Sequence, residues 1–377
     1  MSAGAAPPPE PARDPRDGGP PRDGAPPVDV LGLTLEDFLP LAREHGVRTP
    51  RATACYHAAF REGRALEPWV SIRRPPIVAR QVEGETVKFV QQLAGGLQTE
   101  SVLIPMLGRG TDGAAGRQRG LTHTLCVSSQ VGCAVGCAFC ETAQMGLLGN
   151  LHAADIVAQW FAATHELGVR PKNLVFMGMG EPLDNLDAVL AALIVLCGHH
   201  GPALGAAHVA VSTSGRVDGM ARLGAFVERT GFHKLNLAVS LNAPNDAIRS
   251  ALMPINARHP MAELREAMAA FPVRAKGAIC VEYVLIPGVN DADAHCDELC
   301  DYLRGIRCSL NVIPYNPRRD SPWRAPTEAE VTRFMDRAVA NRQFVRRRQT
   351  KGRSVMGACG QLGNPELRRG AKPVASA

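Results

Sequence analysis

Six short apolar runs rich in β-branched residues alternate along this chain with six longer stretches of helical character. Strands that alternate with helices in this way are parallel and joined by crossovers, so the pattern predicts an α/β barrel or partial barrel. In such folds the functional groups gather where the strands end. The predicted strands are residues 121–128, 173–178, 207–213, 234–241, 278–286 and 309–314, and the predicted helices lie near 152–167, 184–198, 216–230, 260–271, 291–305 and 327–342.

A glycine-punctuated loop after the first predicted strand carries Cys133, Cys137 and Cys140 in a C-x3-C-x2-C spacing. Thiolates are the usual ligands of iron–sulfur clusters. Three of them on a four-iron cubane leave one iron open to a molecule with amino and carboxylate groups, such as S-adenosylmethionine (SAM). The alternative is a zinc site, which normally requires a fourth Cys or His within reach. Phe139, just before the last cysteine, has no role in a zinc knuckle, and the spacing therefore favours a [4Fe–4S] cluster.

Polar groups follow the later predicted strands. Glu181 lies in a glycine-rich turn after the second strand, where its carboxylate is placed to accept hydrogen bonds from the SAM ammonium group. Small hydrogen-bonding groups at Ser212, Ser240 and Asn316 follow the third, fourth and sixth strands and suit a ribose, a carboxylate or an adenine. Each group alone is also ordinary turn chemistry, but their common placement favours a binding site.

Composition restricts the class of protein. Eleven cysteines, an odd number without an export signal, argue against a disulfide framework and for metal-binding or catalytic thiols in the cytoplasm. No apolar run has the length of a membrane span, so we expect no membrane association. The net charge of +6 is mild evidence for a polyanionic partner.

The composition also changes along the chain. Residues 1–27 are rich in proline, glycine and charge and are expected to be a disordered tail. A helical accessory domain is predicted over 28–80, a β extension over 81–120, the main domain over 121–345 and a C-terminal segment over 346–377. The arginines of the accessory region either contact RNA phosphates or form a solvated face, and both readings stay open: Arg61, Arg64, Arg73, Arg74 and Arg80.

Eight motifs in order give this sequence a close resemblance to the RlmN/Cfr family of radical SAM RNA adenine methyltransferases. They span roughly Glu100 to Leu362. The motifs are residues 125–133 (LCVSSQVGC) with the remaining two cysteines, 178–182 (GMGEP), 211–215 (VSTSG), 237–245 (LAVSLNAPN), 252–256 (LMPIN), 282–290 (EYVLIPGVN), 313–317 (IPYNP) and 358–362 (ACGQL).

The resemblance implies a radical SAM partial (β/α)6 barrel with a small N-terminal helical domain and a β extension. It implies that Cys133, Cys137 and Cys140 hold the [4Fe–4S] cluster. It further implies that Cys359 carries a methyl group, that Cys126 forms a disulfide with it during turnover, and that Glu100 is an acid/base group. The implied SAM contacts are Gly180, Glu181, Ser212, Ser240, Leu241, Asn242 and Asn316. The other six cysteines match no motif and are assigned to core packing: Cys55, Cys197, Cys280, Cys296, Cys300 and Cys308.

The activity implied by this resemblance is methylation of carbon 2 of an adenosine in 23S rRNA, with tRNA as a further substrate and a flavodoxin or ferredoxin as one-electron donor. Methylation of carbon 8 is the alternative. From another class, a non-catalytic iron–sulfur RNA-binding redox sensor would need neither Cys359 nor Cys126. A radical SAM enzyme for a small molecule is disfavoured by the basic run Arg342, Arg346, Arg347, Arg348, Lys351 and Arg353, although such runs are often solvated surface.

Two features depart from the family pattern. Asn242 stands where the family usually has histidine, and an asparagine forms hydrogen bonds but does not titrate near neutral pH. Residues 351–358 (KGRSVMGA) lack the acidic residue and the alanine pair that usually precede the final cysteine. We expect the chemistry to be retained and the choice of nucleotide to be affected.

Overall fold

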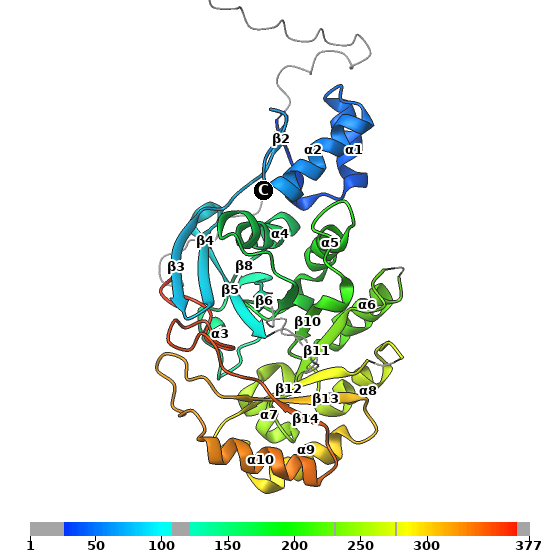
Figure 1. The fold of residues 1–377 in the computed structure, drawn as a ribbon. Coiled ribbons are helices and arrows are strands. Elements are labelled where there is room, and N and C mark those ends of the chain that lie inside the picture. The colour runs from blue at the N-terminus through cyan, green and yellow to red at the C-terminus, as the bar shows by residue number, and fades with distance from the viewer. Residues whose placement is uncertain (1–25, 108–120, 230, 276, 368–377) are drawn as a thin grey trace, which may run out of the picture.

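The computed structural model describes residues 26–107, 121–229, 231–275 and 277–367, and a ten-stranded sheet organises this part of the chain (Figure 1). Its strand order is β14-β13-β12-β11-β10-β9-β6-β5-β4-β3. Strands β6 and β9 to β14 pair in parallel, whereas β3, β4 and β5 pair antiparallel to one another and β5 is antiparallel to β6. The α/β fold with parallel strands joined by crossovers, predicted from the sequence, is therefore confirmed.

All six predicted core strands are present. They are β6 (Leu121–Cys126), β9 (Asn173–Phe176), β10 (Val209–Thr213), β11 (Asn236–Ser240), β12 (Ile279–Leu285) and β13 (Cys308–Pro314). A further parallel strand, β14 (Val345–Arg347), pairs with β13 and was not predicted. It crosses the expected boundary at residue 345, so the main sheet continues into the segment that was predicted to lie outside it.

The six predicted helices also form, and short helices add to them. The predicted helices are α4 (Ala153–Phe161), α5 (Leu186–Cys197), α6 (Val217–Val227), α8 (Met261–Ala270), α9 (Asp293–Leu303) and α10 (Glu328–Ala340), and the additional ones in the core are α3 (Glu141–Met145) and α7 (Asp246–Leu252). Helix α10 shows how the sequence sets a start: the Thr327 side chain accepts from the Glu330 N–H at 3.3 Å, and the Glu330 carboxylate accepts from the Thr327 N–H at 2.7 Å. This capping box satisfies backbone donors at the first turn.

Alternation along the strands separates a packed outer face from a lumen. On β11 and β12, Leu237, Val239, Val281 and Tyr283 are almost completely buried in the main hydrophobic core. Successive strand residues point to opposite faces, so the residues between them face the inside of the curved sheet. These inner residues are small or polar and line an internal cavity: Asn236, Ala238, Cys280, Glu282 and Asn311.

The N-terminal helices α1 (Leu35–Glu44) and α2 (Thr49–Glu62) pack on the main domain near α4 and α5 (Figure 1). Of the arginines considered for RNA, Arg73 forms ion pairs with Asp155 of α4 and with Asp29. Arg64 pairs with Glu62, and Arg74 donates to the Gly63 carbonyl. These three side chains are engaged in intramolecular contacts, which favours a structural role for them. The other two, Arg61 and Arg80, are exposed.

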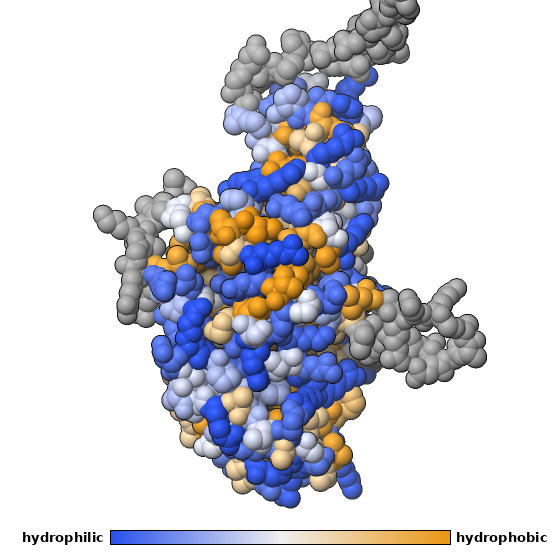
Figure 2. Space-filling view, turned by 60° about the vertical axis from the view of Figure 1, so that its left-hand side comes forward, coloured by the Kyte–Doolittle hydropathy of each residue, from blue (hydrophilic) through white to orange (hydrophobic). Residues whose placement is uncertain are grey.

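The β extension comprises β3 (Ile77–Glu83), β4 (Thr86–Gln92) and β5 (Gln98–Leu107), so it begins at Ile77 and not at residue 81. Strand β3 is the edge of the sheet and exposes Val78 and Val82. Figure 2 turns this side forward and shows hydrophobic residues in bands between hydrophilic ones. Arg80 is also exposed on this strand, and a charge on an edge strand opposes edge-to-edge pairing with another chain.

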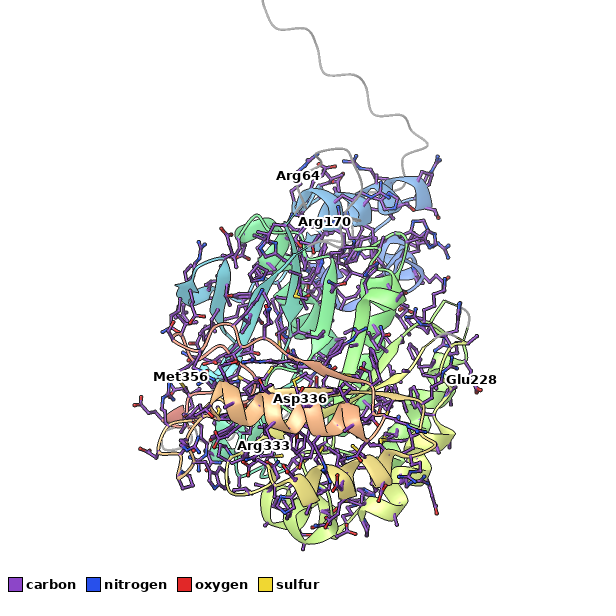
Figure 3. The ribbon with its side chains drawn as sticks, turned by 60° about the horizontal axis from the view of Figure 1, so that its bottom comes forward. Arg64, Arg170, Glu228, Arg333, Asp336 and Met356 are labelled. Carbon is purple, nitrogen blue, oxygen red and sulfur yellow. The ribbon has the colours of Figure 1, made fainter. Side chains whose placement is uncertain are left out.

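The C-terminal segment, defined here as residues 349–367, crosses from β14 to the β extension (Figure 1). Its backbone amides at Gly352 and Gly363 donate to the carboxylates of Glu83 at 2.8 Å and Glu100 at 2.9 Å. Lys88 of β4 donates to the Met356 carbonyl at 3.2 Å, and Figure 3 shows Met356 on the side of the molecule where the β extension lies. The segment thus closes the lumen between the two ends of the parallel sheet. Most of the predicted tail and residues 108–120 lie outside the described residues.

None of the helices described is long and apolar enough to cross a membrane.

Candidate active site

The predicted cluster and SAM residues meet around one cavity at the C-terminal ends of the parallel strands. We call it the cluster-side cavity. Among the residues that line it are Cys133, Cys137, Cys140, Gly180, Glu181, Ser212, Ser240, Asn242, Asn316 and Cys359. Leu241 does not line this cavity: its side chain is fully buried in the core. The structure therefore brings together all the expected cluster and SAM residues except Leu241.

Backbone contacts fix the loop of the three cysteines. Gly132 has a φ of +76°, and a Cβ atom there would lie 1.8 Å from the Gly146 carbonyl oxygen, so only glycine fits. The Cys133 N–H donates to the same oxygen at 2.9 Å. Further along, the Ala138 N–H donates to the Leu252 carbonyl at 2.9 Å. These bonds hold the loop in place independently of any metal.

Cys133 is buried, and Cys137 and Cys140 are half-buried. Desolvation raises the pKa of each thiol, that of Cys133 to about 12. Iron ligation would deprotonate them and release protons. An apolar group that includes Phe139, Met253 and Tyr315 packs beside Cys137 and Cys140 and keeps water from this wall.

Within the described ranges, no three His, Cys, Asp or Glu side chains are arranged to hold a single metal ion. The three cysteines are therefore not grouped as a zinc site. A cubane places its ligands on separate irons and needs no such convergence. The donor set fits a [4Fe–4S] cluster.

The turn after β9 fits an amine-bearing ligand. Glu181 is 3% exposed, and its carboxylate accepts from the Leu183 N–H at 3.0 Å and the Ser214 N–H at 2.7 Å. Burial raises the pKa of this carboxyl group, and the two N–H donors oppose the rise. The Ser214 and Thr213 side chains line the cluster-side cavity and, by hydrogen bonding to this carboxylate, also lower its pKa. A buried carboxylate among several donors at the cavity wall suits a polar ligand such as SAM.

Asn242 has a structural role that explains why asparagine is accepted there. Its φ is +59°, in the left-handed region that asparagine tolerates better than most residues. Its side-chain oxygen accepts from the Val284 N–H at 2.9 Å, and its side-chain nitrogen lies 3.3 Å from the Met253 sulfur. The Asn290 side chain donates to its carbonyl at 2.8 Å. Asn242 thus fastens the end of β11 to the end of β12 while it lines the cluster-side cavity.

A second cavity, of about 640 Å³, occupies the lumen, and we call it the lumen cavity. Cys126, at the end of β6, lines it, and burial raises the pKa of the Cys126 thiol to about 12. Cys359 lines both cavities and so lies at the boundary between them. Its carbonyl accepts from the Asn316 side chain at 3.3 Å, and the adjacent Gly360 carbonyl accepts from the Glu141 N–H at 2.7 Å. Cys126 and Cys359 are free thiols in this structure.

Sequence reasoning missed an ion pair inside the lumen. Arg348 follows β14 and donates through Nη1 to the Glu282 carboxylate at 2.7 Å and to the Met177 sulfur at 3.1 Å. Burial raises the pKa of the Cys359 thiol, and the positive charge of Arg348 opposes that rise. Glu282 is part of a quoted motif but was given no role, and only its spacing from other inward-facing residues would have indicated one.

The basic run near the C-terminus does not form one continuous surface for RNA, because its arginines point in different directions. Arg348 lies in the lumen with Glu282, and Arg347 pairs with Glu328 of α10 on the outside. Arg353 donates to the Asn316 side chain at 3.0 Å. The strand geometry of β14, which turns successive side chains to opposite faces, separates residues that are adjacent in the sequence.

Glu100 lies on β5 and is separated from the thiols by the C-terminal segment. Its carboxylate is 2.8 Å from the Lys88 ammonium and accepts from the Gly363 N–H at 2.9 Å. It lines neither the cluster-side cavity nor the lumen cavity but a third one, beside β3 and β4. The C-terminal segment would have to move before Glu100 could reach an RNA adenine bound beside Cys126. The acid/base role of Glu100 stays a prediction.

The six remaining cysteines divide into two groups. Cys55, Cys296 and Cys300 are buried in the core, and Cys197 and Cys308 are half-buried against it, as core packing requires. Cys280 differs because it lines the lumen cavity with Cys126 and Cys359. Its sulfur accepts from the Asn311 side chain at 2.8 Å, and burial raises the pKa of its thiol to about 12. The assignment of Cys280 to core packing was therefore wrong.

Comparisons with known proteins agree with this geometry. The sequence profile of the Radical SAM superfamily matches residues 127–300. The probable dual-specificity RNA methyltransferase RlmN 1 of Protochlamydia amoebophila is 42% identical over 294 residues, which cover 78% of this chain and 77% of that protein. The dual-specificity RNA methyltransferase RlmN of Anaeromyxobacter dehalogenans is 44% identical over 291 residues, with 75% and 73% covered.

A crystal structure of a radical SAM methyltransferase from Sphaerobacter thermophilus superposes with a TM-score of 0.79 at 35% sequence identity. The match covers 89% of this chain and 99% of that one. The likeness thus extends beyond the central domain to nearly the whole described structure.

Proposed function

Because the chain belongs to the RlmN family of radical SAM methyltransferases, we propose that it methylates carbon 2 of an adenosine in 23S rRNA, and of tRNA as a second substrate, in the cytoplasm. The observation that carries the proposal is the position of Cys359 on both cavities. A sulfur at that boundary can receive a methyl group from the SAM side and present it to a base on the lumen side. Placement of this kind supplies much of the rate of a reaction between two bound molecules.

In this proposal the residues around the cluster-side cavity have three roles: binding the cluster, binding SAM and carrying the methyl group. Cys133, Cys137 and Cys140 would hold the cluster, and Glu181, Ser212, Asn242 and Asn316 would surround SAM. Cys359 first takes a methyl group from SAM and becomes S-methylcysteine. When bound, the cluster and a second SAM would supply the radical that removes a hydrogen atom from this methyl group, and would accept one electron after the addition.

The remaining steps belong to the cysteines. The methylene on the Cys359 sulfur forms a bond to the adenine carbon, which links protein and RNA. An acid/base group, for which Glu100 is proposed, removes the ring proton. The Cys126 sulfur then attacks the Cys359 sulfur: an S–S bond forms, the S–CH2 bond breaks, and the released carbon takes up a proton to become the methyl group. Both thiols border the lumen cavity, as this exchange requires.

Several features support RNA as the substrate. The relatives named above are RNA methyltransferases by name, the net charge is +6, and the lumen cavity has Arg346 and Lys351 on its wall. Cations near a site attract phosphates and make binding dependent on salt. The electron would come from a small one-electron carrier such as flavodoxin or ferredoxin.

Product analysis tests the proposal. The anaerobically reconstituted protein is incubated with SAM, a reductant and 23S rRNA from cells that lack the corresponding gene, and the nucleosides are then separated and identified by mass spectrometry. The expected product is 2-methyladenosine. Formation of 8-methyladenosine instead would establish the alternative carbon, and RNA binding without any methylated nucleoside would favour the redox sensor.

A further inference from the structure

Arg346 of the basic run differs from its neighbours Arg347 and Arg348, which pair with the carboxylates of Glu328 and Glu282. Arg346, on β14, is exposed, and no carboxylate of the described residues lies within ion-pair distance of it. Its guanidinium carbon instead lies 5.0 Å from the centre of the Phe344 ring, over the ring face. Phe344 is 56% exposed. The two side chains therefore form a flat cationic and aromatic pair at the surface.

Strand geometry places Arg346 at the wall of the lumen cavity and Phe344 next to it on the outside. Arg346 is opposite Asn311 in the register of β14 with β13, and both residues line the cavity together with Arg348, Cys126 and Cys359. Side chains two apart on a strand share a face, so Phe344, the residue just before β14, lies on the same side of the strand as Arg346, although it does not itself line the cavity. The lumen cavity thus has Cys359 and Arg346 on its wall, and the exposed Phe344 ring lies directly beside Arg346.

We propose that the Phe344–Arg346 pair is a stacking platform for a base next to the target adenosine in single-stranded RNA. This inference rests on the proposed function and adds to it how the RNA is held. Bases of single-stranded RNA stack on aromatic rings and on arginine guanidinium planes, and every base offers a flat face for such contact. Phe344 supports the guanidinium from below and fixes its plane, and the base covers its other side.

The chemistry of the pair selects this ligand. Phe344 leaves much of its apolar surface exposed beside Arg346, and a guanidinium without a carboxylate partner favours an anionic ligand. RNA satisfies both, because it carries a flat base and a phosphate in each nucleotide. An apolar protein surface would leave Arg346 without a counter-charge, and a small metabolite in the lumen would not reach Phe344 on the open edge.

The test uses the reconstituted protein and a fluorescein-labelled single-stranded RNA of uridines with one central adenosine. In two further RNAs the nucleotide before or after the adenosine is abasic. Phe344→Ala should weaken binding of the intact RNA by roughly five- to one-hundredfold, the usual effect of losing one stacked base. With one of the abasic RNAs, wild type and variant should bind equally, because the stacked base is already missing.

Three variants separate stacking from charge and from folding. Phe344→Trp keeps a larger flat ring and should bind as tightly as wild type. Arg346→Lys keeps the charge but loses the plane, so it should bind like Phe344→Ala while the salt dependence of binding stays that of wild type. Val339→Ala removes another exposed apolar side chain, on α10, and should change nothing.

Two results overturn the platform. One is equal binding of the intact RNA by Phe344→Ala and wild type, and the other is the same loss with intact and both abasic RNAs. Failure of the platform is distinguishable from failure of the proposed function. If only the platform is wrong, wild type still forms methyladenosine in 23S rRNA; if the proposed function is wrong, it does not.

Discussion

The Nη1 atom of Arg348 lies 2.7 Å from the Oε1 atom of Glu282, although strand β13 separates the strands that lead to them. The contact spans the inner face of the curved sheet beside the Cys359 thiol. It places one positive and one negative charge next to the sulfur that is proposed to carry the methyl group, and the two charges act on that sulfur in opposite directions.

Arg348→Met should make Cys359 less reactive at any given pH. The arginine lowers the pKa of this thiol against the effect of burial, so its removal raises the pKa, and the thiolate appears only at higher pH. A rise of one unit in the pKa of the thiol corresponds to about a tenfold loss of thiolate at a fixed pH on the acidic side of the transition. The measurement is alkylation of Cys359 by iodoacetamide across a pH series, read by peptide mass spectrometry.

Arg347→Met is the matched control because Arg347 points outward to Glu328. It should leave the alkylation profile of Cys359 unchanged. If both variants follow the wild-type profile, the charge of Arg348 does not reach the thiol.

Cys137→Ala should abolish cluster binding. Anaerobically purified wild type is expected to hold about four irons and the absorbance of a cubane, because three thiolates retain it. Cys197→Ala, a half-buried cysteine away from the cavity, should keep the iron. Normal iron and sulfide content in Cys137→Ala would show that the ligands have been misassigned.

Cys126→Ala should trap a covalent complex between the protein and RNA. Methylation of Cys359, SAM cleavage and addition to the base do not use Cys126, but only a second thiol opens the methylene bridge. Denaturing electrophoresis after incubation with SAM, reductant and labelled RNA should show a slow band that Cys359→Ala lacks. Free methylated RNA without this band would refute the two-cysteine route and leave Cys126 as a small packing residue.

The presence of Cys280 in the same cavity sharpens that experiment, since it is another thiol near Cys359. If the bridge opens slowly in Cys126→Ala, the double variant Cys126→Ala/Cys280→Ala should retain the complex for longer.

Lys88→Met should destabilise the fold much more than the loss of an exposed ion pair does. The Lys88 and Glu100 side chains are 5% and 8% exposed and 2.8 Å apart, so the variant leaves a buried carboxylate without its counter-ion. The expected loss in the free energy of unfolding is about 3–5 kcal/mol, measured by urea denaturation. Lys88→Met/Glu100→Gln should recover most of it, because the buried charge is removed as well.

Arg64→Met, which breaks an exposed pair with Glu62, is the comparison and should cost at most about 1 kcal/mol. If Lys88→Met loses no more than this, the buried carboxylate is not held by Lys88. The stability measurement is independent of any acid/base role of Glu100.

The sequence was sufficient to predict the six core strands because each is a continuous apolar run whose outer face must be buried, as Val239 and Val281 are. It was not sufficient for β14. In residues 343–348 (QFVRRR), only Phe344 and Val345 are apolar, and three arginines follow them. A run of basic residues is typical of an exposed surface, and nothing in the sequence indicated that these residues alternate along a strand. For that reason Arg348 was expected on the surface, whereas it lies in the lumen.

The common position of the three cysteines proposed as cluster ligands was predictable from local spacing, whereas the path of the C-terminal segment was not. That path is fixed by backbone donors at Gly352 and Gly363, whose partners Glu83 and Glu100 are far away in the sequence. A backbone N–H is present at every residue except proline, so the sequence carries no mark of which one is used. The meeting of Cys126 and Cys359 at one cavity followed only from resemblance to a known family.

The left-handed backbone at Asn242 restricts how this position can drift among related proteins. Asparagine, aspartate and histidine occupy such a conformation several times more readily than other side chains, and glycine does so without strain. A change between histidine and asparagine therefore leaves the chain path intact, while a passage through valine or isoleucine would strain the end of the strand beside the cluster-side cavity. Substitutions in descendants of this protein should follow that short list even where the side chain never meets the substrate.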